Sequence, residues 1–311
     1  MALSCGPGGT VTDAGADGTP DGTAECTPGS EIDLEGWWAL RAFIRLEMVE
    51  DPLATVHVCD DLALATVTWI VRADAASGGD ASFTYRTCDI QLPQVTVSFA
   101  ECSMDETFVA YLLTSASLDA SLPVIEYPGT LGVTVPDRCA EITTNDIFVR
   151  IGILADYDDA VPLPGWDLDC TGSTSLECVP GYESDVQDTD SDGHPGATFE
   201  IDTDPPGLIE GFAWATLRHL PNLRGTVRNS TLVEGVLEPV LEYDFVGSDA
   251  TMAGLDIDTP TVKRNLPEFV PLADGSRFVL VRVDGAHGAV DLTSGGSVTC
   301  NDVLSAPGLF D

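Results

Sequence analysis

Three aspartates at alternate positions, Asp188, Asp190 and Asp192, are followed directly by Gly193. The alternation turns their carboxylates toward one centre, and the glycine allows the sharp bend that brings later ligands round to the same ion. Oxygen ligands in this arrangement are those that Ca²⁺ prefers. The spacing therefore predicts a calcium site, with Ca²⁺ as the cofactor of the protein.

The second half of the loop departs from the EF-hand pattern. The twelfth position counted from Asp188, where that pattern has a bidentate Glu, holds Phe199. We expect the backbone carbonyl of His194 to supply one further ligand, and the carboxylate of Glu200 or Asp202 another. Such a half-loop that runs into a strand is similar to the short calcium loops of extracellular repeat proteins.

The charge balance is strongly acidic. The chain of 311 residues has 51 acidic and 13 basic side chains, a net charge of −38 at pH 7, and Lys263 is its single lysine. This charge repels nucleic acid and anionic membrane surfaces, so neither is expected as a direct partner. It attracts cations, which agrees with a calcium site.

The cysteines indicate disulfides. None of the nine forms a C-x-x-C pair, which excludes zinc, iron–sulfur and c-type haem sites of the usual spacing: Cys5, Cys26, Cys59, Cys88, Cys102, Cys139, Cys170, Cys178 and Cys300. Disulfides in an oxidising compartment remain. We expect a Cys170–Cys178 bridge, because the short loop between these cysteines closes at little cost in chain entropy.

The N-terminus suggests an exported protein. The stretch from Ala2 to Gly6 is similar to the end of a bacterial lipoprotein signal, in which small residues precede a lipidated cysteine, here Cys5. Eight cysteines would then remain for four disulfides; alternatively, Met1 is a true start and Cys5 is a free thiol. Residues 1–30 contain almost nothing apolar to bury and read as a flexible lipoprotein tether. The predicted location is extracellular or on the outer-membrane surface of a bacterium, with a membrane contact only through the lipid anchor.

The rest of the chain reads as all-β. Apolar and β-branched residues recur with a period near two in several segments, which predicts strands at 37–46, 65–71, 82–86, 95–99, 148–153 and 277–283. Gly and Pro separate these segments. The segments 106–116 and 209–220 are compatible with helices or strands, and we favour a strand for the second.

Three pairs of similar segments recur in the same order along the chain. Residues 34–41 resemble 209–218, residues 88–95 resemble 255–262, and residues 148–151 resemble 278–281. The order predicts a duplication. The expected fold is two related antiparallel β-barrel or β-sandwich lobes, 31–155 and 195–311, joined by a disulfide- and calcium-stabilised linker at 156–194.

Two resemblances extend this interpretation. Gly36-x-Trp38, at the start of a long amphipathic strand, resembles the first signature of lipocalin-type barrels, which implies a tryptophan that plugs one end of an eight-stranded barrel. The Asp-rich loop, the start around Cys5 and the glycine-aromatic strand openings together resemble acidic exported lipoproteins of myxobacteria. That second resemblance implies a compartment and no activity.

Catalytic motifs are absent from the sequence. The four histidines, His57, His194, His219 and His287, are isolated, and no His-Glu-x-x-His or Gly-x-Ser-x-Gly pattern occurs. We therefore predict a non-enzymatic structural or binding module at the cell surface, with calcium and another surface protein or a second copy as partners. One alternative is a carrier of an apolar small molecule, which an apolar interior cavity would favour. Another is a carbohydrate-active hydrolase that uses paired carboxylates such as Asp158–Asp159, Asp167–Asp169 or Asp202–Asp204.

Overall fold

The computed structural model of the protein describes residues 33–74, 80–100, 102, 107–133, 141–144, 147–170 and 175–310. The predicted tether at 1–30, the predicted lipidation site Cys5, and Cys26 and Cys139 lie outside the described residues. Residues 75–79 also lie outside them, and the two strands that flank this segment pair antiparallel.

Eight strands form a closed antiparallel barrel. Each pairs with the next barrel strand along the chain, and the last returns to the first: β1 (Gly36–Val49), β3 (Leu62–Ala73), β4 (Asp80–Gln91), β7 (Tyr127–Val133), β8 (Glu141–Thr144), β12 (Leu223–Asn229), β13 (Leu232–Leu237) and β16 (Glu268–Arg282). The barrel is thus an up-and-down barrel, in which closure removes the exposed sheet edges.

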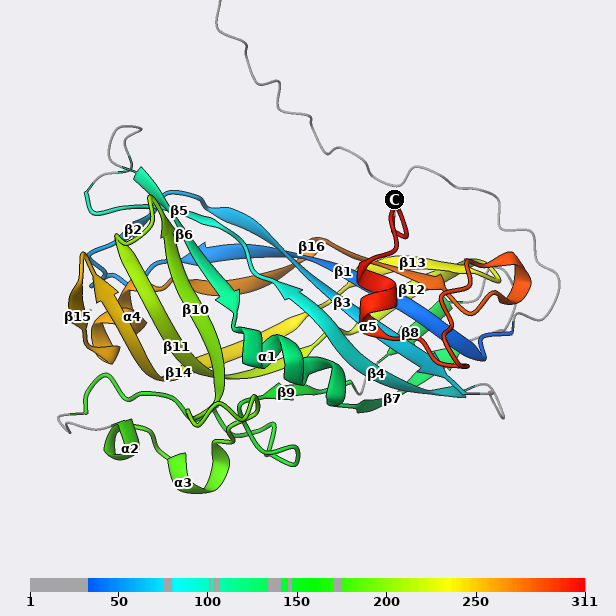
Figure 1. The fold of residues 1–311 in the computed structure, drawn as a ribbon, viewed down its shortest axis with the longest axis horizontal. Helices are drawn as coiled ribbons and strands as arrows, with labels where there is room; N and C mark the ends of the chain where they lie inside the picture. Colours follow the sequence, from blue (N-terminus) through cyan, green and yellow to red (C-terminus); the bar gives the residue numbers. More distant parts are fainter. Residues whose placement is uncertain are drawn as a thin grey trace, which may run out of the picture.

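A second antiparallel sheet is built from the segments between consecutive barrel strands. Its strands are β2 (His57–Val58), β5 (Val95–Ser98), β6 (Thr107–Thr114), β9 (Val149–Ile151), β10 (Ala197–Asp204), β11 (Ile209–Leu220), β14 (Val240–Met252) and β15 (Leu255–Ile257). The order is β15-β14-β11-β10-β6-β5-β2, with β9 also paired to β11. Figure 1 shows this sheet at one end of the molecule, with β7, β8, β12 and β13 of the barrel toward the other.

Short helices connect these strands. They are α1 (Ala116–Ser121), η1 (Leu122–Val124), α2 (Ser175–Cys178), α3 (Tyr182–Asp185), α4 (Thr259–Asn265), η2 (Ala286–Gly288) and α5 (Cys300–Leu304). The Asp258 side chain starts α4, because it accepts a hydrogen bond from the backbone of Thr261, and Pro260 occupies the first turn. Within the described part of the chain, no helix is long and apolar enough to cross a membrane.

The all-β prediction is confirmed, whereas the predicted arrangement in two lobes is not. The barrel combines five strands before residue 150 with three after residue 220, and the second sheet is mixed in the same way. The predicted lobes 31–155 and 195–311 therefore interleave in both sheets. The paired segments also differ in structure: residues 88–95 run from β4 toward β5, but 255–262 run from β15 into α4. Period-two patterning identified strands without identifying their partners.

The barrel interior begins with Trp38. This side chain is 1% exposed, its Nε1 donates to the Leu34 carbonyl at 3.0 Å, and the guanidinium of Arg282 lies 5.4 Å from its ring. Trp37 points to the opposite face, where it packs against a small cluster under α5 and contacts Arg72. Trp38 is thus a buried core residue near the start of β1.

Three disulfides fasten the described chain. They are Cys59–Cys102, Cys88–Cys300 and Cys170–Cys178, and the last confirms the predicted bridge. Cys88–Cys300 holds α5 against β4, over the outer face of the barrel. These bridges are consistent with an oxidising, extracellular environment.

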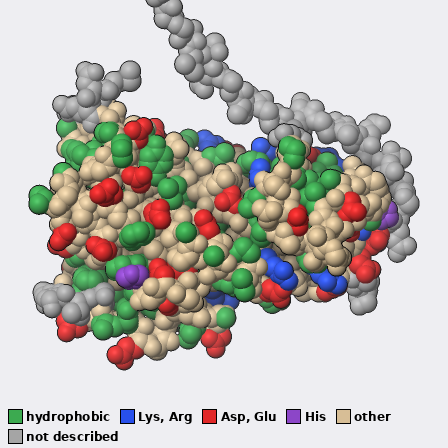
Figure 2. All heavy atoms as spheres, viewed as in Figure 1, with side chains coloured by type: hydrophobic (Ala, Val, Ile, Leu, Met, Phe, Trp, Pro, Cys, Tyr) green, Lys and Arg blue, Asp and Glu red, His purple; other side chains and the backbone are tan. Residues whose placement is uncertain are grey.

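Figure 2 shows acidic side chains distributed over the viewed face rather than gathered in one patch.

Candidate functional site

The Asp-rich loop lies at the start of β10, on the outer face of the second sheet. The Thr189 backbone N–H donates to the Gly196 carbonyl at 3.0 Å, and its hydroxyl accepts from the Gly152 N–H at 2.7 Å. The His194 ring stacks on Trp214 of β11, with ring centroids 4.4 Å apart. These contacts connect the loop to the segment after β9 and to the sheet.

Asp188, Asp190 and Asp192 converge as predicted. One carboxylate oxygen from each lies within 4.8 Å of the others. Asp188 accepts hydrogen bonds from the backbone N–H groups of Asp192 at 3.3 Å and of Gly193 at 3.0 Å. Gly193 has a φ of 90°, the conformation for which the sequence required a glycine.

The buried member of this cluster is Asp190. Its side chain is 5% exposed, and its Oδ2 accepts hydrogen bonds from Ser117 Oγ at 3.1 Å and from the Thr198 N–H at 3.2 Å. Its Oδ1 has no hydrogen-bond donor among the described residues. Burial raises the pKa of Asp190, and the charge of Asp192 adds to this effect. A buried carboxylate oxygen without a partner is costly, and a bound cation would supply what it lacks.

The other predicted ligands are placed differently. Glu200 and Asp202 are not part of the carboxylate cluster, because β10 runs away from the loop at about 3.3 Å per residue. The His194 imidazole rests on Trp214, and its backbone N–H donates to Asp192 Oδ1 at 2.8 Å. Thr198 is the β10 residue that reaches the loop, and its hydroxyl donates to Asp192 Oδ2 at 2.6 Å.

Sequence reasoning missed Thr198 and Ser117 as partners of the loop. Hydroxyls that follow the Asp-rich stretch could have drawn attention to Thr198, which lies close in the chain. No local pattern points to Ser117, because α1 reaches Asp190 only through the pairing of β6 with β10.

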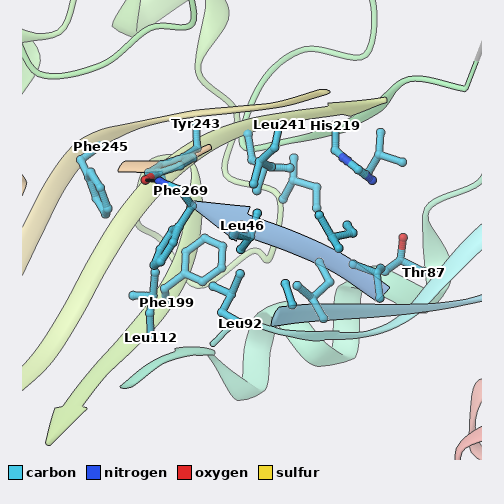
Figure 3. Close-up of a pocket in the computed structure, with 18 of the residues that line it drawn as sticks. Leu46, Thr87, Leu92, Leu112, Phe199, His219, Leu241, Tyr243, Phe245 and Phe269 are labelled. Atoms are coloured by element: carbon cyan, nitrogen blue, oxygen red, sulfur yellow. Dashed lines mark hydrogen bonds between the residues drawn. The ribbon is translucent and has the colours of Figure 1, made fainter. Parts of the chain in front are cut away.

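A second candidate site is an apolar cavity inside the protein. It lies between barrel strands β1, β3 and β4 and the strands β9, β10, β11 and β14 of the second sheet, and its volume is about 70 Å³. Figure 3 shows the rings of Phe199, Phe245 and Phe269 gathered at one end, with His219 and Thr87 at the other.

Two residues that line this cavity, His219 and Thr87, have a buried polar atom without a hydrogen-bond partner among the described residues. The His219 ring is 5% exposed, stacks on Trp69, and binds the Val240 carbonyl through Nδ1 at 3.0 Å. Burial lowers the pKa of His219 to about 4, so the ring is neutral at pH 7. Because a carbonyl can only accept, Nδ1 carries the proton and Nε2 presents a lone pair. Neither His219 Nε2 nor Thr87 Oγ1 has a partner in the described structure.

A second apolar cavity of about 70 Å³ adjoins the first. It lies beneath α4, and Leu112 and Phe269 line both cavities. A surface cleft of about 440 Å³ between residues 89–94 and 111–114 shares Leu112 with both of them, and Ile90 and Leu92 with the first. The two cavities and the cleft therefore form neighbouring compartments.

The carboxylate pairs considered for a hydrolase have partners within the structure. Asp159 binds Arg150 at 2.8 Å and lies 3.5 Å from Arg218. Asp167 Oδ1 accepts the backbone N–H of Asp169 at 2.9 Å, and Asp202 Oδ1 accepts that of Thr203 at 2.7 Å. These contacts hold Asp159, Asp167 and Asp202 in place within the structure.

Comparison with known proteins adds no family assignment. The chain matches no protein-family model, and no curated protein or solved structure is significantly similar to it.

Proposed function

We propose that the protein is a non-enzymatic binding module outside the bacterial cell, in which Asp188, Asp190 and Asp192 hold a structural Ca²⁺. The observation that carries this proposal is the buried Asp190 carboxylate, which has one unpartnered oxygen and two further carboxylates beside it. A hard divalent cation would neutralise the three charges and complete the coordination of that oxygen.

A bound calcium ion would stabilise the fold by linking separate segments of the chain. Asp190 already joins Ser117 of α1 to Thr198 of β10, and Thr189 holds the chain after β9 through Gly152. An ion in this loop would connect three segments that are distant in the sequence. The ion would raise the free energy of unfolding because it binds the folded protein more tightly than the unfolded chain.

The proposed location rests on the cysteines and the charge. Three disulfides favour an oxidising compartment, and an acidic surface favours solubility there and the attraction of cations. The lipid anchor at Cys5 belongs to the same proposal. It would leave the described domain outside the membrane, at the end of the tether.

Calorimetric titration with CaCl₂ at pH 7 tests the site. The wild-type protein should take up one ion, and Asp190→Asn should abolish this binding while keeping an acceptor for Ser117 and Thr198. At a calcium concentration 100 times Kd, the wild-type protein should gain about 2.7 kcal/mol of unfolding free energy over the EGTA-treated protein. Asp156→Asn, which changes an exposed carboxylate in the segment after β9, is the matched control and should bind like wild type.

Two results would contradict the proposal. One is a wild-type protein that shows no saturable calcium uptake. The other is an Asp190→Asn variant whose melting temperature rises with calcium as much as that of the wild-type protein. The same titration with MgCl₂ distinguishes a calcium site from general attraction of cations to an acidic surface, since the latter would give similar weak heats for both metals.

A further inference from the structure

The interior cavity leaves two buried polar atoms without partners on otherwise apolar walls. Thr87 is fully buried and His219 nearly so. Both residues line this cavity, and Thr87 Oγ1 and His219 Nε2 have no hydrogen-bond partner among the described residues. Each such atom destabilises the folded protein relative to an apolar replacement. Two such atoms in residues at the same end of one cavity indicate that a bound molecule supplies their missing hydrogen bonds.

We infer that the cavity binds a small neutral apolar molecule with a single hydroxyl group, an alcohol or a phenol. This site goes beyond the proposed calcium function and shares no ligand residue with it. His219 Nε2 offers only an acceptor, because Nδ1–H donates to the Val240 carbonyl. The Thr87 hydroxyl can donate. A ligand hydroxyl satisfies both, since it donates to His219 and accepts from Thr87.

Other polar head groups fit less well. An ether or a ketone can accept from Thr87 but leaves His219 Nε2 unpaired. A carboxylate or an ammonium would place a charge among apolar walls without a counter-ion, which costs several kcal/mol. The chemistry of the two protein atoms therefore selects a neutral hydroxyl.

The apolar part of the ligand would extend away from His219. The rings of Phe199, Phe245 and Phe269 line the opposite end of the cavity, as Figure 3 shows. Beyond Phe269 and Leu112 lies the second cavity under α4. Each cavity has about 70 Å³, so a slender chain that displaces these two side chains and occupies both fits better than a broad ring system.

The surface cleft provides a route to the cavity. It shares Ile90, Leu92 and Leu112 with the cavity wall, so movement of these side chains would join the two spaces. Asp89 and Asp119 line the cleft. Their carboxylates would repel anionic amphiphiles such as fatty acids and admit neutral ones.

The first test is calorimetric titration of the full protein, in saturating calcium, with primary alcohols from 1-butanol to 1-decanol. Affinity should rise about fourfold per methylene until the cavities are filled. The methyl ether of the best alcohol should bind about tenfold more weakly, because it cannot donate to His219. The carboxylate of the same length should show no binding. A wild-type protein that binds no alcohol, or that binds alcohol and ether equally, overturns the inference.

Variants test the two polar atoms. Thr87→Val and His219→Phe should each weaken the best alcohol about tenfold and leave the melting temperature of the unliganded protein unchanged or higher, since each removes an unpartnered polar atom. Thr68→Val is the matched control. The Thr68 hydroxyl, on the neighbouring strand β3, accepts a hydrogen bond from Arg41 and does not line the cavity. Its removal should not change alcohol affinity. If His219→Phe fails to fold, Thr87→Val alone decides. Wild-type affinity in Thr87→Val contradicts the assignment.

Discussion

His219 is held as a neutral imidazole inside the protein, and this links stability to pH. Its pKa falls from an ordinary value of 6.5 to about 4, chiefly through burial. Between those two values the unfolded chain binds a proton that the folded protein does not. The contribution of His219 to unfolding free energy is therefore complete above pH 6.5 and decreases as the pH falls toward 4.

We predict that the stability difference between wild type and His219→Phe changes in favour of the variant as the pH is lowered from 7 to 4. The shift should reach about 3 kcal/mol, measured by urea unfolding at each pH. A constant difference between wild type and His219→Phe would show that the folded protein protonates this ring at ordinary cost.

At the scale of single residues, the sequence indicated the chemistry of the loop better than its surroundings. Alternating aspartates before a glycine are a local pattern, so Asp188, Asp190 and Asp192 could be recognised and do converge. Glu200 and Asp202 were chosen by distance along the chain, although both lie on a strand that leads away. Thr87 and His219 carry no local signal, because residues of β4 and β11 line the same cavity only in the folded protein.

At the scale of elements, Cys88–Cys300 and Cys170–Cys178 should differ in their effects. The first joins cysteines 212 positions apart and holds α5 over Ala39, Ile70 and Val283. The second closes a loop with a separation of 8. A longer closed loop restricts the unfolded chain more, so replacing both cysteines of the first bridge by alanine should cost about 3 kcal/mol more than the same change in the second.

Denaturant unfolding measures the two losses, and hydrogen exchange locates them. Exchange should accelerate in residues 298–304 for the Cys88/Cys300 double variant, while β11 and β14 remain protected. In the other double variant, acceleration should be confined to the segment around α2 and α3. Equal losses of stability would indicate that the two bridges act mainly through folded-state contacts instead of chain entropy.

Strands were the most predictable elements. The segment 209–220 forms β11 with those boundaries, and 106–116, which was compatible with either class, contains β6. α4 was missed because it has only seven residues, too few to show a helical period, although Asp258 and Pro260 are proper start signals. Short helices of this kind depend on tertiary packing, here of Val262 against the second sheet.

At the scale of the whole molecule, the alternation of apolar and polar residues shows which face of a strand is buried but not which strands pair with each other. β1 pairs with β16 at the far end of the sequence, and the second sheet gathers insertions from between consecutive barrel strands. Nothing local in Leu112 or Tyr243 indicates that these side chains line opposite walls of one cavity. The sequence therefore supported an all-β class, while the division into lobes was not confirmed, because similar strand patterns in the two halves do not show which strands pair.

The Asp-rich loop and the cavity lie on opposite faces of the same backbone. Thr198 binds Asp190, and the next residue, Phe199, lines the cavity. Gly152 binds Thr189 of the loop, and its neighbour Ile151 also lines the cavity. An ion that orders the loop would thus also hold two parts of the cavity wall in place. Binding of an alcohol to the calcium-loaded protein would then cost less conformational entropy, because this part of the wall is already ordered.

We therefore predict that calcium and alcohol bind cooperatively. Saturating calcium should tighten the best alcohol about fivefold relative to EGTA, and the alcohol should tighten calcium by the same factor, because coupling between two binding equilibria is reciprocal. Calorimetry in both directions measures the two factors, and Asp190→Asn should remove the dependence of alcohol affinity on calcium. Alcohol affinity that is identical with calcium and with EGTA would mean that the loop leaves the shape of the cavity unchanged, and that the two sites act independently.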